Sequence, residues 1–214
     1  MYMKKVEVVK DKIRKVRSDK KRDVKPTISA ELKNCVYRLS YITNTPVKDV
    51  VEIICEKGLE SRKVLEYLSQ YFRRDYQFVN TIFIGDPGRE SLQKKSQSGR
   101  NERITTRFNQ DTYEKIKYLS GALDVTPSKA TALLLEASIR NTELLNSYMR
   151  NFLRGTLDKM RMKELKQVQL FVKKSNPYSK ETSWFDLIDT IVEDVKDNTV
   201  NIKESITTWL DRLK

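Results

Sequence analysis

One pattern occurs twice in this chain and limits what it can fold into. A short strand of alternating polar and apolar residues leads into a helix, and Thr-Pro-x-Lys then begins a second helix. The first copy runs from about Val24 to Ser61, with Thr45 to Lys48 at its centre. The second runs from about Arg103 to Asn141, with Thr126 to Lys129 in the matching place, 81 residues later (126 minus 45). A fixed offset indicates duplicated supersecondary units, so one structural interpretation has to explain both copies.

The second copy shows the pattern more clearly. Its strand alternates between a core face (Ile104, Thr106, Phe108) and an outward polar face (Arg103, Thr105, Arg107). Asn109 is the expected N-cap of the first helix and Thr126 that of the second. Pro127 then takes the first helical position, where a missing amide hydrogen costs nothing.

The first copy follows the same plan, with a one-residue deletion before the turn. Its strand places Val24, Pro26 and Ile28 toward a core and Lys25, Thr27 and Ser29 outward, and Asp23 stands where the second copy has Arg103. Ser29 and Thr45 are the expected N-caps, and the second helix is expected to end near Gly58-Leu59. Pro26 requires a strand with an unpaired amide position, which a two-stranded ribbon supplies.

Charge and composition narrow the class of protein. Lys and Arg number 42 against 29 Asp and Glu, a net charge of +13, which favours a polyanionic partner, although a lysine-rich proteome would give the same excess. There is no histidine, and Cys35 and Cys55 are the two cysteines. Metal sites and nucleophile-plus-base sets are therefore hard to assemble, so we expect neither an enzyme nor a cofactor. Both thiols are expected to be buried and reduced.

The ends of the chain differ in charge. Residues 1–25 carry 11 Lys or Arg and 4 acidic residues, whereas residues 181–214 carry 8 acidic and 4 basic residues. Residues 1–23 are thus expected to be a basic arm that meets an anion. No apolar stretch approaches the roughly 20 residues that cross a bilayer, and no signal peptide is evident, so the sequence predicts a cytoplasmic protein without a membrane partner.

The remaining segments complete the predicted organisation. Between the two units (24–61 and 103–141), residues 62–102 read as a helical extension to about Phe72, a strand over 77–84 and a flexible linker from Gly85. Such a linker lets the two units pair with each other or across chains. Residues 142–214 are expected to be helical, with a break at Asn176-Pro177 and new helices after Ser183 and Asn201. This region suits a protein partner or self-association.

Because a lone strand with two helices has too little core to stand alone, each unit needs a partner strand. At this point the sequence resembles the ribbon-helix-helix DNA-binding proteins of the Arc/MetJ type, here in tandem as in relaxosome accessory proteins. The resemblance rests on Arg103 to Asn141 (RITTRFNQDTYEKIKYLSGALDVTPSKATALLLEASIRN) and on Val24 to Ser61, roughly a third of the chain. It implies a mainly α fold: two units, each of one short β-strand and two helices, with a helical C-terminal region.

The resemblance also implies a site. Paired strands of that family enter the major groove of DNA, and the candidates for reading bases are Lys25, Thr27, Arg103, Thr105 and Arg107. Asp23 departs from this pattern. The second helix of each unit begins at a phosphate in the family, which makes Thr45, Lys48, Thr126 and Lys129 the candidate phosphate contacts. Free amides and the positive end of the helix dipole favour an anion there on physical grounds as well.

The sequence therefore predicts a sequence-specific binder of double-stranded DNA, acting as a repressor or as a plasmid partition or relaxosome accessory factor. One alternative is a protein-interaction module, such as an antitoxin or assembly scaffold, with only non-specific affinity for nucleic acid. Another is binding of RNA or single strands, since tyrosines (Tyr67, Tyr71, Tyr76) lie near Arg73-Arg74. Aromatic residues at helical spacing are more often core residues.

Overall fold

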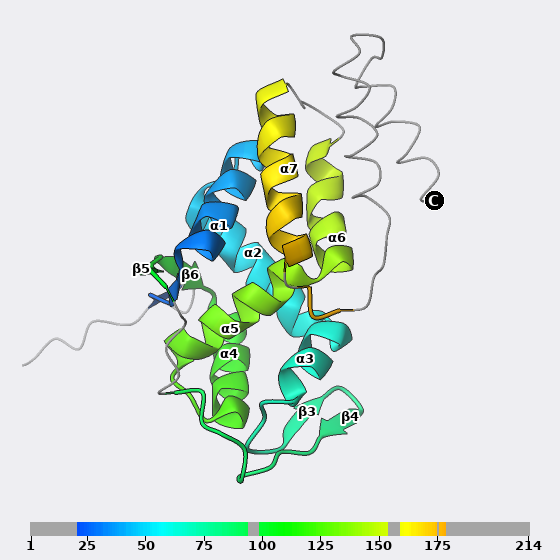
Figure 1. The fold of residues 1–214 in the computed structure, drawn as a ribbon. Helices are drawn as coiled ribbons and strands as arrows, with labels where there is room; N and C mark the ends of the chain where they lie inside the picture. Colours follow the sequence, from blue (N-terminus) through cyan, green and yellow to red (C-terminus); the bar gives the residue numbers. More distant parts are fainter. Residues whose placement is uncertain (1–20, 94–98, 154–158, 175, 179–214) are drawn as a thin grey trace, which may run out of the picture.

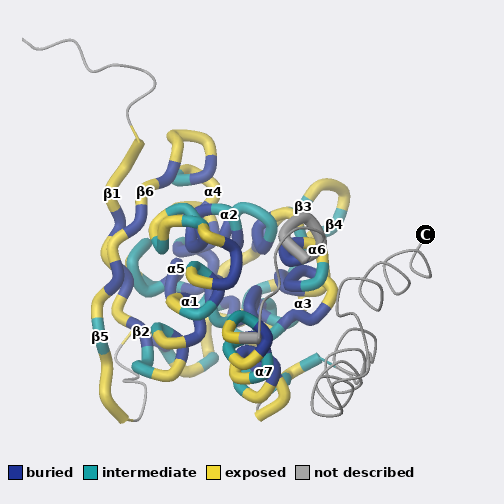
Figure 2. The backbone as a smooth tube through the Cα atoms, turned by 90° about the horizontal axis from the view of Figure 1, so that it is seen from above, coloured by how far each residue is buried: buried dark blue, intermediate teal, exposed yellow. Residues whose placement is uncertain are grey.

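The computed structural model describes residues 21–93, 99–153, 159–174 and 176–178 (Figure 1). Over these residues the chain is mainly helical, with helices α1 to α7 and three pairs of short antiparallel strands. Two of the pairs form a ribbon at one edge of the molecule, and the helices pack behind it (Figure 2). The predicted class, mainly helical with a few short strands, is confirmed.

The ribbon joins segments that are far apart in the sequence. β1 (Arg22–Val24) pairs with β6 (Thr106–Phe108), and β2 (Thr27–Ser29) pairs with β5 (Asn101–Arg103). Both pairings share one register, because Val24 lies opposite Thr106 and Thr27 lies opposite Arg103. Between them, the carbonyl of Pro26 accepts the Ile104 N–H at 3.1 Å. The two repeats therefore pair within one chain, a choice that the sequence left open.

Alternation along the ribbon gives it two different faces, as predicted. One face packs on the helices and is buried, and the other is exposed to solvent. The buried residues are Val24, Pro26, Ile28, Ile104, Thr106 and Phe108, and the exposed residues are Asp23, Lys25, Thr27, Arg103, Thr105 and Arg107. Pro26, which has no N–H to donate, lies at the interruption between the two ladders.

The first helix of each unit begins at the predicted cap. Ser29 accepts the Leu32 N–H at 3.2 Å at the start of α1 (Ala30–Thr43), and Asn109 accepts the Thr112 N–H at 2.7 Å at the start of α4 (Gln110–Leu123). Both helices end at a left-handed residue that turns the chain sharply, Asn44 (φ 51°) and Asp124 (φ 54°). Asn and Asp tolerate this conformation better than most residues do.

The second helices correct the predicted alignment of the repeats. α5 (Pro127–Arg140) is capped by Thr126, as expected, but α2 (Val47–Glu60) has Pro46 as its N-cap and no side-chain cap. Equivalent helices begin 80 residues apart (110 minus 30 for the first, 127 minus 47 for the second), so there is no deletion before the turn. The prediction that Thr45 caps α2 was wrong, because Thr45 lies one position too early.

α2 and α5 cross closely behind the ribbon. A Cβ added to Gly58 would lie 2.0 Å from Ser138 Oγ and 3.1 Å from Leu134 Cδ1. Gly58 and Ser138 are again 80 residues apart, so this crossing joins equivalent points of the two units. α2 ends at Glu60, close to the end predicted near Gly58-Leu59, and the absence of a side chain at Gly58 permits the close approach of the two helices.

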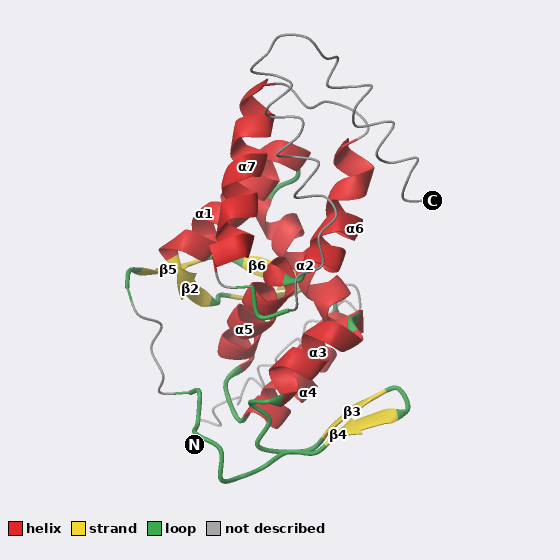
Figure 3. Cartoon of the chain, turned by 45° about the vertical axis from the view of Figure 1, so that its right-hand side comes forward, coloured by secondary structure: helices red, strands yellow, loops and turns green. Residues whose placement is uncertain are grey.

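The segment between the units is more ordered than its composition suggests. α3 (Arg62–Ser69) is shorter than the predicted helical extension to about Phe72. A hairpin of β3 (Tyr76–Phe78) and β4 (Thr81–Phe83) replaces the single strand predicted over 77–84, and Val79 in its turn has φ 51°. The hairpin projects from the helices (Figure 3). Part of the predicted linker is hydrogen-bonded to the rest of the fold. Arg89 donates to the Ser69 and Phe72 carbonyls, and Gln93 accepts the Thr126 N–H. Residues 94–98 lie outside the described residues.

Two further helices pack on the helices of the two units. α6 (Thr142–Leu153) packs on α5 and α2, and α7 (Lys159–Lys174) runs along α1 (Figure 1). Ion pairs join α7 to α1, with Arg38 to Glu164 at 2.8 Å and Lys174 to Glu31 at 2.9 Å. α7 ends before Asn176-Pro177 as predicted, and the helices predicted after Ser183 and Asn201 lie outside the described residues. Of the predicted arm over residues 1–23, residues 1–20 also lie outside them, whereas Arg22 and Asp23 belong to β1 and not to an arm.

Apolar side chains of both units and of α3, α6 and α7 form one core. It includes Cys35 and Cys55, which are buried and unpaired as expected, and burial raises the pKa of Cys35 to about 12. Met160 and Leu170 of α7 lie outside this core and are 60% and 50% exposed. No helix in the described part of the chain is both long and apolar enough to span a bilayer.

Candidate nucleic-acid interface

All five predicted base-reading residues lie on the exposed face of the ribbon. The shared register sets Lys25 opposite Thr105 at the centre and Thr27 opposite Arg103 on one side. On the other side Arg107 lies opposite Asp23. Two short segments from distant parts of the chain are thus combined into one polar surface, which carries three cationic side chains and one carboxylate.

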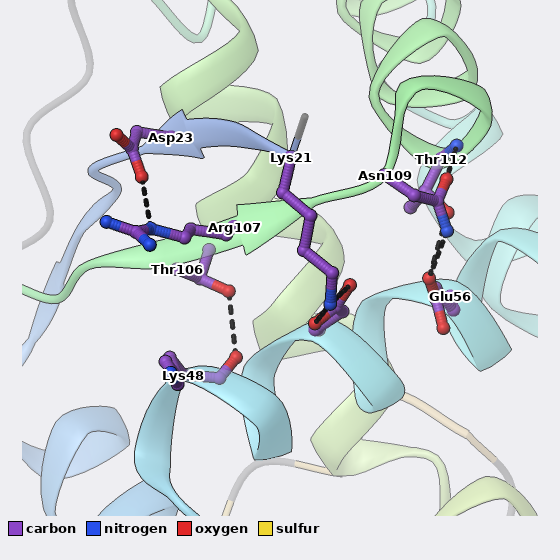
Figure 4. Close-up of polar contacts among 9 residues, drawn as sticks. Lys21, Asp23, Lys48, Glu56, Thr106, Arg107, Asn109 and Thr112 are labelled. Carbon is purple, nitrogen blue, oxygen red and sulfur yellow. Dashed lines mark hydrogen bonds and ion pairs between the residues drawn. The ribbon is translucent and has the colours of Figure 1, made fainter. Parts of the chain in front are cut away.

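Arg107 and Asp23 are joined across the ribbon (Figure 4). Arg107 Nε donates to Asp23 Oδ1 at 2.7 Å, and the two side chains are 58% and 57% exposed. Lys25 and Arg103 make no recorded polar contact with the residues that the structure describes. Within the described part of the chain, the face therefore presents two cations without a partner and one arginine that is held by a carboxylate.

Below this face, the ribbon is fastened to α2. Thr106 Oγ1 donates to the Lys48 carbonyl at 2.9 Å on the buried side of β6, and Lys21 Nζ donates to both oxygens of Glu52 at 2.7 Å (Figure 4). Glu52 is only 7% exposed. The hydrogen bond to this carboxylate raises the pKa of Lys21, so the Lys21 ammonium group stays charged near neutral pH. The Lys21–Glu52 ion pair was not predicted from the sequence. The available signal was Glu52, an acidic residue on the apolar face of the helix.

A second ion pair flanks the other end of the ribbon. Glu102, next to Arg103, is paired with Lys33 of α1 and with Arg100, and the Lys33 hydrogen bond lowers the pKa of Glu102. Its negative charge is therefore balanced by two cations.

The start of α2 lies directly behind the ribbon, since Lys48 is bonded to Thr106. The Lys48 side chain is exposed, whereas Thr45 donates its hydroxyl to the Thr43 carbonyl and its N–H to the Ser40 carbonyl. Asp49 adds a carboxylate to the first turn. Of the two residues predicted here to contact phosphate, Lys48 has an exposed side chain, whereas the Thr45 hydroxyl is already hydrogen-bonded within the protein.

The start of α5 is built differently. Thr126 is exposed and Lys129 half-buried, and the first turn holds no acidic residue. Two amides are already used, because the Thr126 N–H donates to Gln93 Oε1 at 2.9 Å and the Lys129 N–H to Thr126 Oγ1 at 3.3 Å. Lys48 and Lys129 also occupy different positions in their first turns, since the helices begin 80 rather than 81 residues apart. The two predicted phosphate sites are therefore not equivalent.

The tyrosines considered for stacking on single strands pack within the protein. Tyr76 is 5% exposed and lies 4.8 Å from the ring of Tyr118, while Tyr67 contacts Tyr71 edge-on. Arg73 and Arg74 are both paired with Asp124. This cluster offers no open stacking platform. Among the described residues, no three His, Cys, Asp or Glu side chains are grouped to hold a metal ion.

Comparisons with protein-family models, curated proteins and solved structures find no match to this chain.

Proposed function

We propose that this protein binds double-stranded DNA sequence-specifically and reads the major groove with the exposed face of its ribbon. The observation that carries the proposal is this face, where Lys25, Arg103 and Arg107 project from two antiparallel strands of one chain. A two-stranded ribbon fits the major groove, and arginine can bond both acceptors of guanine. The buried face holds the ribbon on the helices, which leaves its outward side chains for DNA.

The arrangement of the units supports assignment to the tandem ribbon-helix-helix type. Each strand segment is followed by two helices, and the second helices cross at equivalent points, Gly58 and Ser138. A protein of this type would act in the cytoplasm as a repressor or as a plasmid partition or relaxosome accessory factor.

Phosphate contacts follow from the same arrangement. Lys48 at the start of α2 is exposed beside the ribbon, and Lys129 lies in the first turn of α5 behind the cap Thr126. Helix N-termini attract anions, and lysine adds charge at the same point. Thr45 contributes less than the sequence suggested, because its hydroxyl already donates to the Thr43 carbonyl.

Selection from a random duplex library, followed by footprinting of the enriched site, tests the proposal. We expect one preferred site for the wild-type chain. The Arg107→Ala variant should lose preference at one position of that site, because a bidentate arginine contact contributes about 1–3 kcal/mol of discrimination. Lys129→Ala should instead weaken binding to all duplexes and reduce the slope of log K against log salt by about 1. Absence of an enriched duplex would overturn the proposal.

The alternative is a protein-interaction module, which a separate observation favours. The hairpin exposes Val79, Ile82 and Ile84 at 63–77%, and α7 exposes Leu170. Apolar groups gathered on a projecting element are typical of contact surfaces. This alternative predicts DNA binding without a preferred duplex, together with self-association that Ile82→Lys abolishes in sedimentation experiments.

A further inference from the structure

The two ends of the exposed ribbon face are not equivalent, although the units that form them are. Lys25 and Thr105 lie opposite each other and 80 residues apart, so the axis that relates the units passes between them. The same relation makes Asp23 the equivalent of Arg103, and Thr27 the equivalent of Arg107. At one end an arginine therefore faces a carboxylate, and at the other end an arginine faces a hydroxyl.

The contact between Asp23 and Arg107 constrains how the guanidinium group can be used. Only Nε is bonded to Asp23 Oδ1, and the structure records no other acceptor for Arg107 among the described residues. Fixing Nε sets the plane of the group and leaves the two terminal nitrogens, Nη1 and Nη2, side by side at its end. This pair of donors matches the O6 and N7 acceptors of guanine.

Arg103 has no such constraint. It lies opposite Thr27, and no carboxylate of the described residues is recorded as its partner. A freely rotating guanidinium loses more side-chain entropy when it binds a base in one orientation, and it can bond a phosphate equally well. The two arginines of the ribbon therefore differ in selectivity even though both are exposed cations.

We propose that Asp23 is a positioning residue that holds Arg107 for end-on bidentate recognition of guanine, so that the DNA site is read strongly at one end and weakly at the other. This rests on the proposed function. Asp23 does not contact the base itself, and its charge is neutralised by the arginine it holds. The preferred site is consequently asymmetric, with a required guanine only under Arg107.

Removal of Asp23 should change affinity and selectivity in opposite directions. The outward face carries three cations and one carboxylate, so Asp23→Thr adds one net positive charge. Binding to random duplex should become tighter and more dependent on salt, because counterion release grows with the charge that meets the phosphates. Preference for guanine under Arg107 should fall by about 5-fold or more, at the lower end of what one bidentate contact provides. A merely structural role would not produce this combination.

The cross-strand register supplies a gain-of-function variant. Thr27→Asp places a carboxylate directly opposite Arg103, as Asp23 lies directly opposite Arg107. Library selection with this variant should show a new preference for guanine under Arg103, at the end of the site that the wild-type chain reads weakly. In the double variant Asp23→Thr/Thr27→Asp, the required guanine should move to the other end. A misfolded protein cannot gain a preference, so this readout does not depend on how well Asp23→Thr folds.

The outcomes separate the inference from the function on which it rests. If the wild-type chain enriches no duplex, the proposed function fails. If it enriches a site, but Asp23→Thr and Thr27→Asp both enrich that same site with unchanged base preferences, the positioning role of Asp23 is overturned while DNA binding stands.

Discussion

At the scale of single residues, a glycine decides how closely the two units approach. Gly58 lies inside α2, where glycine costs about 0.5–1 kcal/mol relative to alanine. It is present because the helix of the other unit passes within 2.0 Å of where its Cβ would stand. The ribbon packs on these two helices.

Gly58→Ala should therefore destabilise the fold, although the substitution favours a helix. Overpacking of a core costs about 1–3 kcal/mol, which exceeds the gain in helix propensity, and we expect a net loss of about 1–2 kcal/mol in urea unfolding. Adding Ser138→Ala should recover part of the loss, because the hydroxyl is the nearest atom to the new methyl group. A more stable Gly58→Ala protein would show that the helices do not cross this closely.

At the scale of elements, the two second helices begin in different ways despite their shared sequence motif. Thr126 caps α5 with its hydroxyl, whereas α2 begins at Pro46 with no side-chain cap, and Thr45 lies in the preceding turn. The constant spacing of the left-handed residues Asn44 and Asp124 sets where each helix can begin. The Thr-Pro-x-Lys motif therefore lies one residue earlier relative to the start of α2 than relative to the start of α5.

Matched threonine substitutions test this difference. Thr126→Ala removes an N-cap, which typically costs about 1 kcal/mol of stability. Thr45→Ala removes a 3.3 Å hydrogen bond to the Thr43 carbonyl and a contact with the Tyr148 hydroxyl, which keeps its contact with Thr43. Neither contact caps a helix, and we expect a change within about 0.5 kcal/mol. Chemical denaturation of both variants measures the difference. Equal losses would mean that both threonines act as caps.

At the scale of the whole molecule, pairing within the chain makes the ribbon independent of association. Both strands of each ladder belong to one polypeptide, and the intervening segment is held against the body by Arg89 and Gln93. Strands tethered in this way meet at an effective concentration of about millimolar, which free chains in dilute solution do not reach.

The thermal unfolding midpoint should consequently be independent of protein concentration. A ribbon formed between two chains would unfold with dissociation, and its midpoint would rise with concentration by mass action. Calorimetry over a wide range of dilution distinguishes the two cases. A midpoint that rises steadily with concentration would contradict pairing within the chain.

Features that depend on neighbours along the chain could be predicted from the sequence. Strand alternation, the caps Ser29, Asn109 and Thr126, and the helix break at Asn176-Pro177 follow from local periodicity and backbone chemistry, and all of them appear in the structure. The polar residues of the candidate site could be placed on the outward face for the same reason.

Which groups meet across the fold could not be predicted in this way. The Asp23–Arg107 and Lys21–Glu52 pairs join residues 84 and 31 positions apart, and their formation depends on strand register and helix packing rather than on local pattern. Pairing within the chain was equally open in the sequence, because a polar linker permits either partner. Local sequence chemistry determines whether each segment forms a strand or a helix. Burial of the shared core around Gly58 and Ser138 determines where that segment lies in the fold.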